Sequence, residues 1–447
     1  MTAPNFINLP LFTVLSVEET DHDYHVAAES AQSPGACISC QSKDIVGFGK
    51  RAQLYNDLPI HGKRVGIMMN RRRYKCKSCG VTFYEPLATM HEHHRATVRL
   101  VRYIEHESMR QTFASVAADT GVDEKTIRNI FKRCAEQLDK TVRFELPQWM
   151  GIDEIHIIKK PKCVITNVEH NTVVDMLPNR EKQALTAYFK SLGTQKSSVR
   201  YVAMDMWRPY KLVVKENIPN AKIVVNKFHV MRMGNVALEM HRKSIRRTLN
   251  SRQRVKLMRD RFILLKRPNE ITTVERDLMG PWFEAFPTLG LAYELKEGFF
   301  GIWENASSRQ NAEVLFDAWK ARITPDVEVH FKPILTAFEN WHEEIFAYFD
   351  HPIANAYTES LNSLTRVINR NGRRYSFEAL RAKVLYTEGT HRIVKPAHRV
   401  VSKGQNLNIG MSLDAGYGLP PDQEPSEKNY GAFIPDLVRM LEKEATD

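Results

Sequence analysis

Three acidic residues that are far apart in the sequence stand where a divalent metal ion would need its ligands. Asp153 ends the apolar segment WMGID, Asp205 ends the apolar segment VRYVAMD, and Glu359 lies on the amphipathic stretch NAYTESLNSLTRVINR. A carboxylate at the end of a buried strand is costly unless it is paired, hydrogen-bonded or bound to a cation. Mg²⁺ takes hard oxygen ligands and keeps water molecules for chemistry, so the pattern predicts a magnesium or manganese site.

The chemistry that such a trio supports is phosphoryl transfer. Two metal ions ~4 Å apart can activate a water or a 3′-hydroxyl and stabilise the leaving oxygen. The ordinary alternative for each acid taken alone is a capping or surface carboxylate. Because three acids fall in suitable elements, and other motifs of the chain point to nucleic acid, we favour a site for two Mg²⁺ or Mn²⁺ ions.

The segments around the acids predict an α/β sheet. Three strand-like segments in hairpin order follow Pro147, and a helix, a strand, a second helix and a fifth strand come after them. This is the order of an RNase H-like core with mixed strand directions, in which the strands that carry Asp153 and Asp205 are neighbours. Residues 236–345 look wholly helical and are too long for a connecting loop, so they predict an inserted helical subdomain.

Two C-x2-C pairs near the start of the chain predict a structural zinc site. They are Cys37 with Cys40 and Cys76 with Cys79, and 35 residues separate the pairs. Two such knuckles can place four thiolates tetrahedrally around one Zn²⁺; the alternative is two unrelated cysteine pairs. The remaining cysteines and the nearby histidines are expected to be packing and surface residues, namely Cys134, Cys163, His91, His93 and His94.

A run of positive charge lies between the two cysteine pairs, with no acidic residue from His61 to Gly80. On a zinc-stapled hairpin this run would suit the phosphate backbone of DNA, although a charge run is usually just solvated. Its members are Lys63, Arg64, Arg71, Arg72, Arg73, Lys75 and Lys77.

The stretch FASVAADTGVDEKTIRNIFKRC has the signature of a helix-turn-helix. Ala117 would let two helices approach, Gly121 would allow the positive φ of the turn, and Ile127 and Ile130 would face the core. The alternative is a plain helical hairpin. In a helix-turn-helix, the start of the second helix reads a major groove, and the predicted DNA contacts there are Lys125, Thr126, Arg128 and Asn129.

Composition and charge are consistent with a soluble protein that binds a polyanion. The 447 residues include 43% hydrophobic and 26% charged residues, and the net charge is +12. Neutralisation of phosphates by Lys and Arg releases counterions, so this balance suits nucleic acid. The start MTAPNFINLPLFTVLSV lacks a basic region and is broken by Pro10, so we expect no signal peptide and a cytoplasmic, nucleoid-associated bacterial protein without a membrane partner.

Several stretches together resemble one family, the ISL3 insertion-sequence transposases, which are DDE enzymes. They span about Cys37 to Tyr386 and are CISC with CKSC, GIDEIHI, YVAMDMWRPY, AKIVVNKFHV, LKEGFFGIW and NAYTESLNSLTRVINRNGRRYSFEALRAKVLY. The resemblance implies that Asp153, Asp205 and Glu359 are the catalytic triad. It also implies DNA cleavage at terminal inverted repeats, joining of the 3′ ends to a target, and an oligomer, expected to be a dimer, that bridges two ends.

The resemblance draws attention to Asn226 and His229. Members of the family usually have Asp-(Lys/Arg)-Phe-His at this place, whereas this chain has Asn226, Lys227, Phe228 and His229. An amide keeps the shape and one acceptor oxygen of the acid but brings no negative charge. We expect both residues beside the catalytic centre, with His229 supporting the metal ligands and Asp205, rather than position 226, acting as the second ligand.

Further candidates for DNA contact lie later in the chain. Trp303 in FFGIWENA is a candidate for stacking on a base, because related transposases use an insertion-domain tryptophan in this way, although most tryptophans in helical bundles are core residues. Arg242, Lys243, Arg246 and Arg247 form a basic stretch that is either solvated or functional. The preferred phosphate contacts follow the Glu359 helix and are Arg370, Arg373 and Arg374.

The expected fold class is a multidomain α+β protein with an N-terminal zinc ribbon, a helix-turn-helix and an RNase H-like α/β core interrupted by an all-helical insertion. The expected segments are an N-terminal tail (1–30), zinc ribbon (31–90), helix-turn-helix (91–146), first core part (147–235), insertion (236–345), second core part (346–395) and C-terminal segment (396–447). Two other functions remain open. One is a transposase-derived DNA-binding regulator without catalysis, and the other is a different RNase H-like DNA nuclease.

Overall fold

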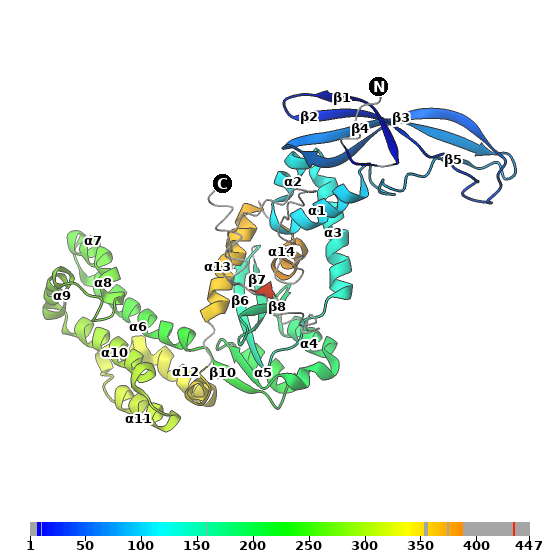
Figure 1. Cartoon of the computed structure of the whole chain (residues 1–447). Helices are drawn as coiled ribbons and strands as arrows, with labels where there is room; N and C mark the ends of the chain where they lie inside the picture. Colours follow the sequence, from blue (N-terminus) through cyan, green and yellow to red (C-terminus); the bar gives the residue numbers. More distant parts are fainter. Residues whose placement is uncertain are drawn as a thin grey trace, which may run out of the picture. The chain divides into compact units, whose positions relative to one another are not determined.

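The computed structural model describes residues 7–9, 11–158, 160–352, 356–372, 375–387 and 432–433, and for residues 356–360 and 432–433 it describes the backbone alone. The chain divides into two compact units (Figure 1). The first contains Met1–Arg143 with Ile368–Thr387, and the second contains Phe144–Val367 with Glu388–Asp447. Within the described residues, none of the helices has the length and apolar character that crossing a membrane requires.

A five-stranded sheet opens the first unit. Its strands are β1 (Phe12–Glu19), β2 (Asp23–Ser30), β3 (Ile45–Ile60), β4 (Lys63–Cys76) and β5 (Thr82–Tyr84), in the order β1-β2-β4-β3 with β5 on β4. The long hairpin of β3 and β4 turns at His61 and Gly62, which both have positive φ. The second cysteine pair therefore follows the end of one hairpin strand, as the spacing of the pairs predicted.

The expected N-terminal tail at residues 1–30 was wrong for residues 12–30, which form β1 and β2. Phe12 and Val14 alternate with exposed residues and are buried, as are Tyr24, Val26 and Ala28 on the next strand. Of the acidic residues here, Glu18 and Glu19 end β1, Asp21 lies in the turn and Asp23 begins β2. Apolar residues with a period of two are enough to bury one face of a hairpin.

Three helices follow the sheet in the first unit, and they are α1 (Val98–Arg110), α2 (Phe113–Thr120) and α3 (Glu124–Thr141). Thr112 and Asp123 cap α2 and α3 by accepting backbone N–H groups. Gly121 has a φ of +69° and donates its N–H to Ala117, and Ile127 and Ile130 are buried. The predicted helix-turn-helix geometry is confirmed.

Gly121→Ala is expected to destabilise the first unit by about 1 kcal/mol or more, because an L side chain is strained at positive φ. The added Cβ would also lie 3.2 Å from Cδ of Arg64. Differential scanning calorimetry of the full chain would measure this. The control is Gly47→Ala in β3 of the same unit, which has open space around it and no positive φ and is expected to be neutral or stabilising. An equal or larger loss from the control would contradict the strain at Gly121.

A fourth helix of the first unit comes from much later in the chain. Helix α14 (Phe377–Leu385) packs on α1 and α3. Buried Lys383 donates to the carbonyls of Ser108 and Gln111, and its ammonium lies 4.9 Å from the ring of Phe113. The expected second core part, residues 346–395, is thus divided in this structure, because the lysine and apolar residues of α14 are satisfied by the helix-turn-helix region.

The second unit contains a six-stranded mixed sheet. Its strands are β6 (Trp149–Ile157), β7 (Lys160–Asn167), β8 (Thr172–Leu177), β9 (Tyr201–Met204), β10 (Lys222–Val225) and β11 (Ala432–Phe433). The order is β10-β9-β6-β7-β8-β11, with β6, β9 and β10 parallel and β6, β7 and β8 antiparallel. Helices α4 (Lys182–Ser191) and α5 (Arg208–Asn217) connect the later strands, with the short 3₁₀ helix Gly193–Ser198 after α4. This is the predicted RNase H-like topology.

Both leftover cysteines have the packing role that the sequence predicted. Cys163 is fully buried in β7, where burial raises the pKa of its thiol to about 12. Cys134 is half-buried on α3, and burial raises its pKa to about 11. Both thiols stay protonated at neutral pH and are poor metal ligands.

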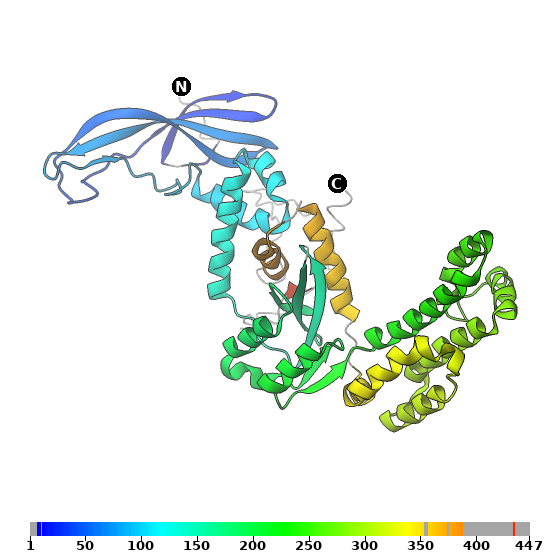
Figure 2. The same cartoon turned by 180° about the vertical axis from the view of Figure 1, so that it is seen from behind.

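A bundle of helices interrupts the core, as expected, and it is drawn in green and yellow in Figure 2. The helices are α6 (Lys227–Thr248), α7 (Ser251–Arg259), α8 (Arg261–Leu265), α9 (Thr273–Ala285), α10 (Pro287–Asn305), α11 (Arg309–Lys320) and α12 (Pro325–Asp350). The insertion thus begins directly after β10 and ends at Asp350, which extends the expected range 236–345 at both ends. It is tied to α5 by an ion pair of 2.6 Å between Lys211 and Glu344. Helix α13 (Ala356–Asn371) follows.

Candidate catalytic centre and nucleic-acid interface

Two neighbouring parallel strands, β9 and β10, end at one level, and at that level β6, which continues to Ile157, carries a polar residue as well. Ile152 on β6 and Val225 on β10 are both in register with Met204 on β9. The next positions along the three strands are Asp153, Asp205 and Asn226. The prediction that the two strands are neighbours is therefore confirmed, but Asp153 lies within β6 and does not end it, whereas Asp205 directly follows β9.

His229 lies between the two carboxylates. It is in the first turn of α6, where its backbone N–H bonds to the carbonyl of Asn226. Its Nδ1 is 3.4 Å from Oδ1 of Asp205, and its Nε2 is 3.8 Å from Oδ1 of Asp153. The imidazole contacts both acids, which agrees with the expected place of His229 beside the metal ligands.

Asp153 and Asp205 are held by their own backbone as well. Oδ1 of Asp153 accepts the N–H of Glu154 at 2.7 Å, and Oδ1 of Asp205 accepts the N–H of Met206 at 2.6 Å. Asp153 is only 5% exposed, whereas Asp205 is half-buried. A carboxylate buried to this degree needs donors or a cation, and for Asp153 the backbone N–H of Glu154 and the amide of Asn362 are such donors.

Asn226 is a structural cap of α6. Its Oδ1 accepts the N–H of Phe228 at 3.2 Å, and its backbone N–H bonds to the carbonyl of Met204 at 3.0 Å. Asn226 is 1% exposed, and within the described residues its Nδ2 has no hydrogen-bond partner. An aspartate would cap the helix equally well. Capping therefore explains the role of Oδ1 of Asn226 but not that of its buried Nδ2.

Asn362 is a site residue that the sequence reasoning did not select. Its Nδ2 donates to Oδ2 of Asp153 at 3.0 Å and lies 3.4 Å from the carbonyl of Glu154. The side chain is 6% exposed on α13, three residues after Glu359. The signal in the sequence was this spacing of one helical turn, which places Asn362 and Glu359 on the same face.

Asn362→Ala is expected to raise the Mn²⁺ concentration that half-saturates strand cleavage by about 10- to 100-fold, because residues that orient metal ligands typically contribute this much. The matched control is Ser363→Ala on the exposed side of the same helix, for which we expect no change. A purely structural role for Asn362 would lower the maximal rate or stability without moving the Mn²⁺ dependence, and that outcome would contradict the assignment.

The backbone of Glu359 belongs to α13, but its side chain is outside the described residues, as are Arg373 and Arg374. Arg370 is exposed in the last turn of α13.

Trp303 is on α10, where its ring centroid lies 4.9 Å from that of Phe299 and 6.3 Å from that of Phe338. Such packing favours the core role for this tryptophan over base stacking.

The four cysteines of the two C-x2-C pairs converge in the first unit, as predicted. Their sulfur atoms all lie within 4.8 Å of one another, with Cys37 Sγ to Cys79 Sγ and Cys40 Sγ to Cys76 Sγ both at 3.6 Å. A tetrahedral Zn²⁺ with Zn–S bonds of about 2.3 Å separates its sulfurs by about 3.8 Å. The backbone N–H of Cys79 lowers the pKa of Cys76 below its usual range. The cluster fits structural zinc.

The basic run between the cysteine pairs is largely engaged within the protein. Lys63 pairs with Glu19 at 2.6 Å, Arg64 with Asp23 at 2.7 Å, and Arg72 with Glu85 at 2.8 Å. The three acids lie outside the stretch from His61 to Gly80. The sequence of that stretch alone therefore did not show that its cations are paired. Arg71 donates to the carbonyl of Glu85, and Arg73 lies 5.2 Å from the ring of Phe48. These cations stabilise the sheet, and Lys75, which is exposed, is better placed for phosphate.

The predicted recognition residues lie at the start of α3. Lys125, Arg128 and Asn129 are exposed, and Thr126 is half-buried. Arg128 pairs with Glu124 and lies 4.8 Å from the ring of Phe113.

The histidines between the sheet and α1 are less exposed than expected, since His91 and His94 are half-buried with their rings 4.7 Å apart. Burial lowers the pKa of both.

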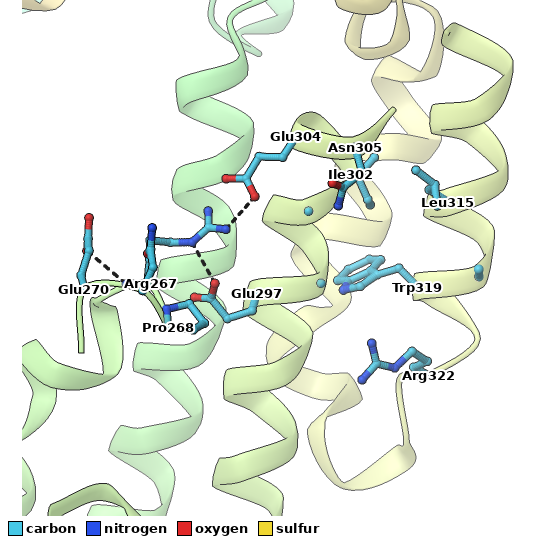
Figure 3. A pocket seen from close by; sticks show the side chains of 14 residues that line it. Arg267, Pro268, Glu270, Glu297, Ile302, Glu304, Asn305, Leu315, Trp319 and Arg322 are labelled. Carbon is cyan, nitrogen blue, oxygen red and sulfur yellow. Dashed lines mark hydrogen bonds and ion pairs between the residues drawn. The ribbon is translucent and has the colours of Figure 1, made fainter. Parts of the chain in front are cut away.

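A cavity of about 770 Å³ lies inside the insertion, and no residue of the sheet lines it (Figure 3). It is bordered by α10, α11 and the segment after α8. Arg267 crosses one side and pairs with Glu297 and Glu304, both at 2.8 Å. The cavity is thus distinct from the two aspartates, and Arg267 is neutralised by two of its acids.

Comparison with known families agrees with this arrangement. Residues 150–384 match a transposase family model of the ISL3 type. Residues 33–79 match the zinc-finger of transposase IS204/IS1001/IS1096/IS1165, and residues 90–135 match the helix-turn-helix domain of transposase family ISL3. The first match alone covers more than half of the chain. The chain belongs to the ISL3 family of transposases.

A curated relative is the transposase for insertion sequence element IS1001 of Bordetella parapertussis. It is 22% identical over 330 residues, which are 71% of this chain and 80% of that protein. For this ISL3 transposase the matches confirm the predicted zinc ribbon and helix-turn-helix, and with them a DNA-binding front end and a structural zinc.

Proposed function

We propose that this ISL3 transposase binds the terminal inverted repeats of its element, cleaves the DNA strands there and joins the 3′ ends to target DNA. Asp153, Asp205 and Glu359 are the proposed catalytic residues. The observation that carries the proposal is the pair of aspartates on adjacent parallel strands, bridged by His229. An RNase H-like sheet in a member of a transposase family supports phosphoryl transfer over other chemistry at this edge.

The proposed cofactor is a pair of Mg²⁺ or Mn²⁺ ions held by the three carboxylates. The donors fit, because Asp153 and Asp205 offer hard oxygen atoms and Asp153 is too buried to carry its charge without partners. The ions would activate the attacking oxygen and stabilise the leaving one. Asn362 and the backbone N–H of Glu154 orient Asp153, the N–H of Met206 orients Asp205, and His229 limits the separation of the two carboxylates.

Recognition of the element ends is proposed for the first unit. The exposed side chains at the start of α3, Lys125, Arg128 and Asn129, would read the major groove with Thr126 beside them. The zinc ribbon would hold the phosphate backbone through Lys75, and the arginines after Glu359, including exposed Arg370, would contact phosphates near the cut. A dimer that bridges two ends is the proposed assembly.

A regulator without catalysis is the second candidate, and Asn226 is the observation that favours it, because the family resemblance leads one to expect an acid there. Divalent-metal-dependent cleavage of the element's own end, abolished by Glu359→Gln, separates the transposase from this regulator. Joining of the cleaved 3′ ends to target DNA separates it from another RNase H-like nuclease. Absence of cleavage by the unaltered chain with Mn²⁺ would favour the regulator.

A further inference from the structure

The helical insertion has two parts of opposite charge. Residues 240–267 contain eleven Lys and Arg and one acid, Asp260, for a net charge of +10. Residues 268–350 contain fifteen Asp and Glu and six Lys and Arg, for a net charge of −9. The insertion as a whole is nearly neutral, so the basic overall composition of the chain does not explain this separation.

The positive part is the end of α6 with α7 and α8, which Figure 1 shows at one end of the bundle. Helix α7 exposes every residue except Leu257. Within the described residues, seven cations here have no ion-pair partner, and an eighth, Lys243, is 3.7 Å from Glu239. Two of the seven are engaged otherwise, since Arg254 donates to the carbonyls of Arg247 and Leu249 and Arg261 lies 4.4 Å from the ring of Phe262. We call the other six the basic tip, and its members are Lys243, Arg246, Arg247, Arg252, Lys256 and Arg259.

The other cations of this segment serve the fold. Arg242 is buried, pairs with Glu239 at 2.7 Å and donates to the carbonyl of Leu257, which fastens α7 to α6. Lys266 pairs with Glu275 at 2.6 Å, and Arg267 is paired across the cavity. Asp260, the one acid, accepts the indole N–H of Trp282 at 2.8 Å. The charge of the basic tip is therefore not balanced locally.

Unpaired cations crowded on two short helical segments repel one another and favour a polyanionic partner. We propose that the basic tip binds the phosphate backbone of duplex DNA without regard to sequence. Helix α7 is about 13 Å long, and duplex DNA carries one charge per about 1.7 Å of its axis, so several phosphates lie within its reach. The acidic remainder of the insertion would repel DNA, which confines the contact to this end.

This contact is additional to the recognition proposed for the zinc ribbon and helix-turn-helix, and it rests on the proposed function only in taking DNA as the substrate. The acidic part of a second copy is the other polyanion available. DNA is favoured because the contact needs no shape match, and the six cations of the basic tip outnumber the exposed apolar side chains among them, Val255, Met258 and Phe262.

The test is the salt dependence of full-length protein binding to a duplex of arbitrary sequence. The triple variant Arg247→Gln, Arg252→Gln and Arg259→Gln is compared with a matched triple, Arg276→Gln, Lys320→Gln and Lys332→Gln. The matched residues are exposed cations of the acidic part without an ion-pair partner among the described residues, so both triples change the net charge equally. A third variant with Arg→Lys at the three tip positions keeps the charge.

We call the variant with the three arginines of the basic tip replaced by glutamine the tip triple. It should make the slope of the logarithm of the association constant against the logarithm of the salt concentration shallower by about 0.9 for each lost contact, or about 2.7 in all. It should also weaken binding at least ~10-fold at about 50 mM salt. The matched triple and the Arg→Lys variant should keep the original slope. Equal losses from both triples would overturn the proposal. A change in sedimentation of the DNA-free protein with an unchanged slope would assign the tip to a second copy. Cleavage of a short element end by the tip triple, measured in parallel, tests the proposed function separately.

Discussion

Asp205→Asn is expected to lower the rate of metal-dependent strand cleavage by about 10³-fold or more, which corresponds to about 4 kcal/mol of transition-state stabilisation. The amide keeps the size of the side chain and can still accept the N–H of Met206, but it removes the negative charge that would hold the metal ions. DNA affinity should stay near that of the unaltered chain, because recognition lies in the first unit. Single-turnover cleavage of a labelled element end, with a parallel binding titration, measures both effects.

Two further variants sharpen this prediction. Asp175→Asn is the matched control, because Asp175 also accepts the N–H of its following residue but lies on β8, two strands away from β6. It should cleave normally. Asn226→Asp adds a carboxylate beside Asp205 and is expected to preserve or increase activity if the position tunes the metal site. An active Asp205→Ala protein would overturn the assignment of Asp205.

Cys76→Ser is expected to reduce the zinc content from one ion per chain to a small fraction and to lower affinity for the element end by at least ~10-fold. Structural zinc contributes about 10–16 kcal/mol in small zinc domains, and Cys76 is a fully buried member of the four-sulfur cluster at the end of the long hairpin. Without it, the two C-x2-C loops are no longer joined firmly, and the hairpin end that carries Lys75 loses its shape. Zinc is measured by atomic emission after dialysis.

The control for zinc is Cys134→Ser, which alters a half-buried thiol outside the cluster. This variant should retain one zinc ion and normal affinity. Retention of stoichiometric zinc by the Cys76→Ser protein would contradict the tetrahedral four-cysteine site.

The parts of the molecule that were predictable from the sequence depend on local patterns. Apolar runs ending in Asp153 and Asp205 indicated both strands, and the order of the elements indicated that the two strands are neighbours, although β6 continues past Asp153 to Ile157. The C-x2-C spacing gave the metal site, and the placement of Gly121 gave the turn. In each case a short-range rule, such as the period of a strand or the φ of a glycine, decides the structure.

The parts that could not be predicted depend on contacts between distant residues. Asn362 reaches Asp153 across 209 positions, and Arg64 meets Asp23 across 41. Nothing in the run from His61 to Gly80 shows that its cations are neutralised by acids on other strands. Likewise, the periodicity of residues 377–385 indicates a helix but not that Lys383 would be buried against α1 and α3. Tertiary packing decides which residues form hydrogen bonds and ion pairs with one another. A local sequence pattern carries no information about that packing.

The most direct measurement is a crystal structure of the full chain with Mn²⁺ and DNA of its element end, with anomalous scattering used to locate the metal. We expect manganese between the carboxylates of Asp153 and Asp205, with Glu359 completing its protein ligands, and loss of the peak in the Asp205→Asn protein. Manganese bound elsewhere, or a Glu359 carboxylate too distant to share the ions, would contradict a three-carboxylate centre in this transposase.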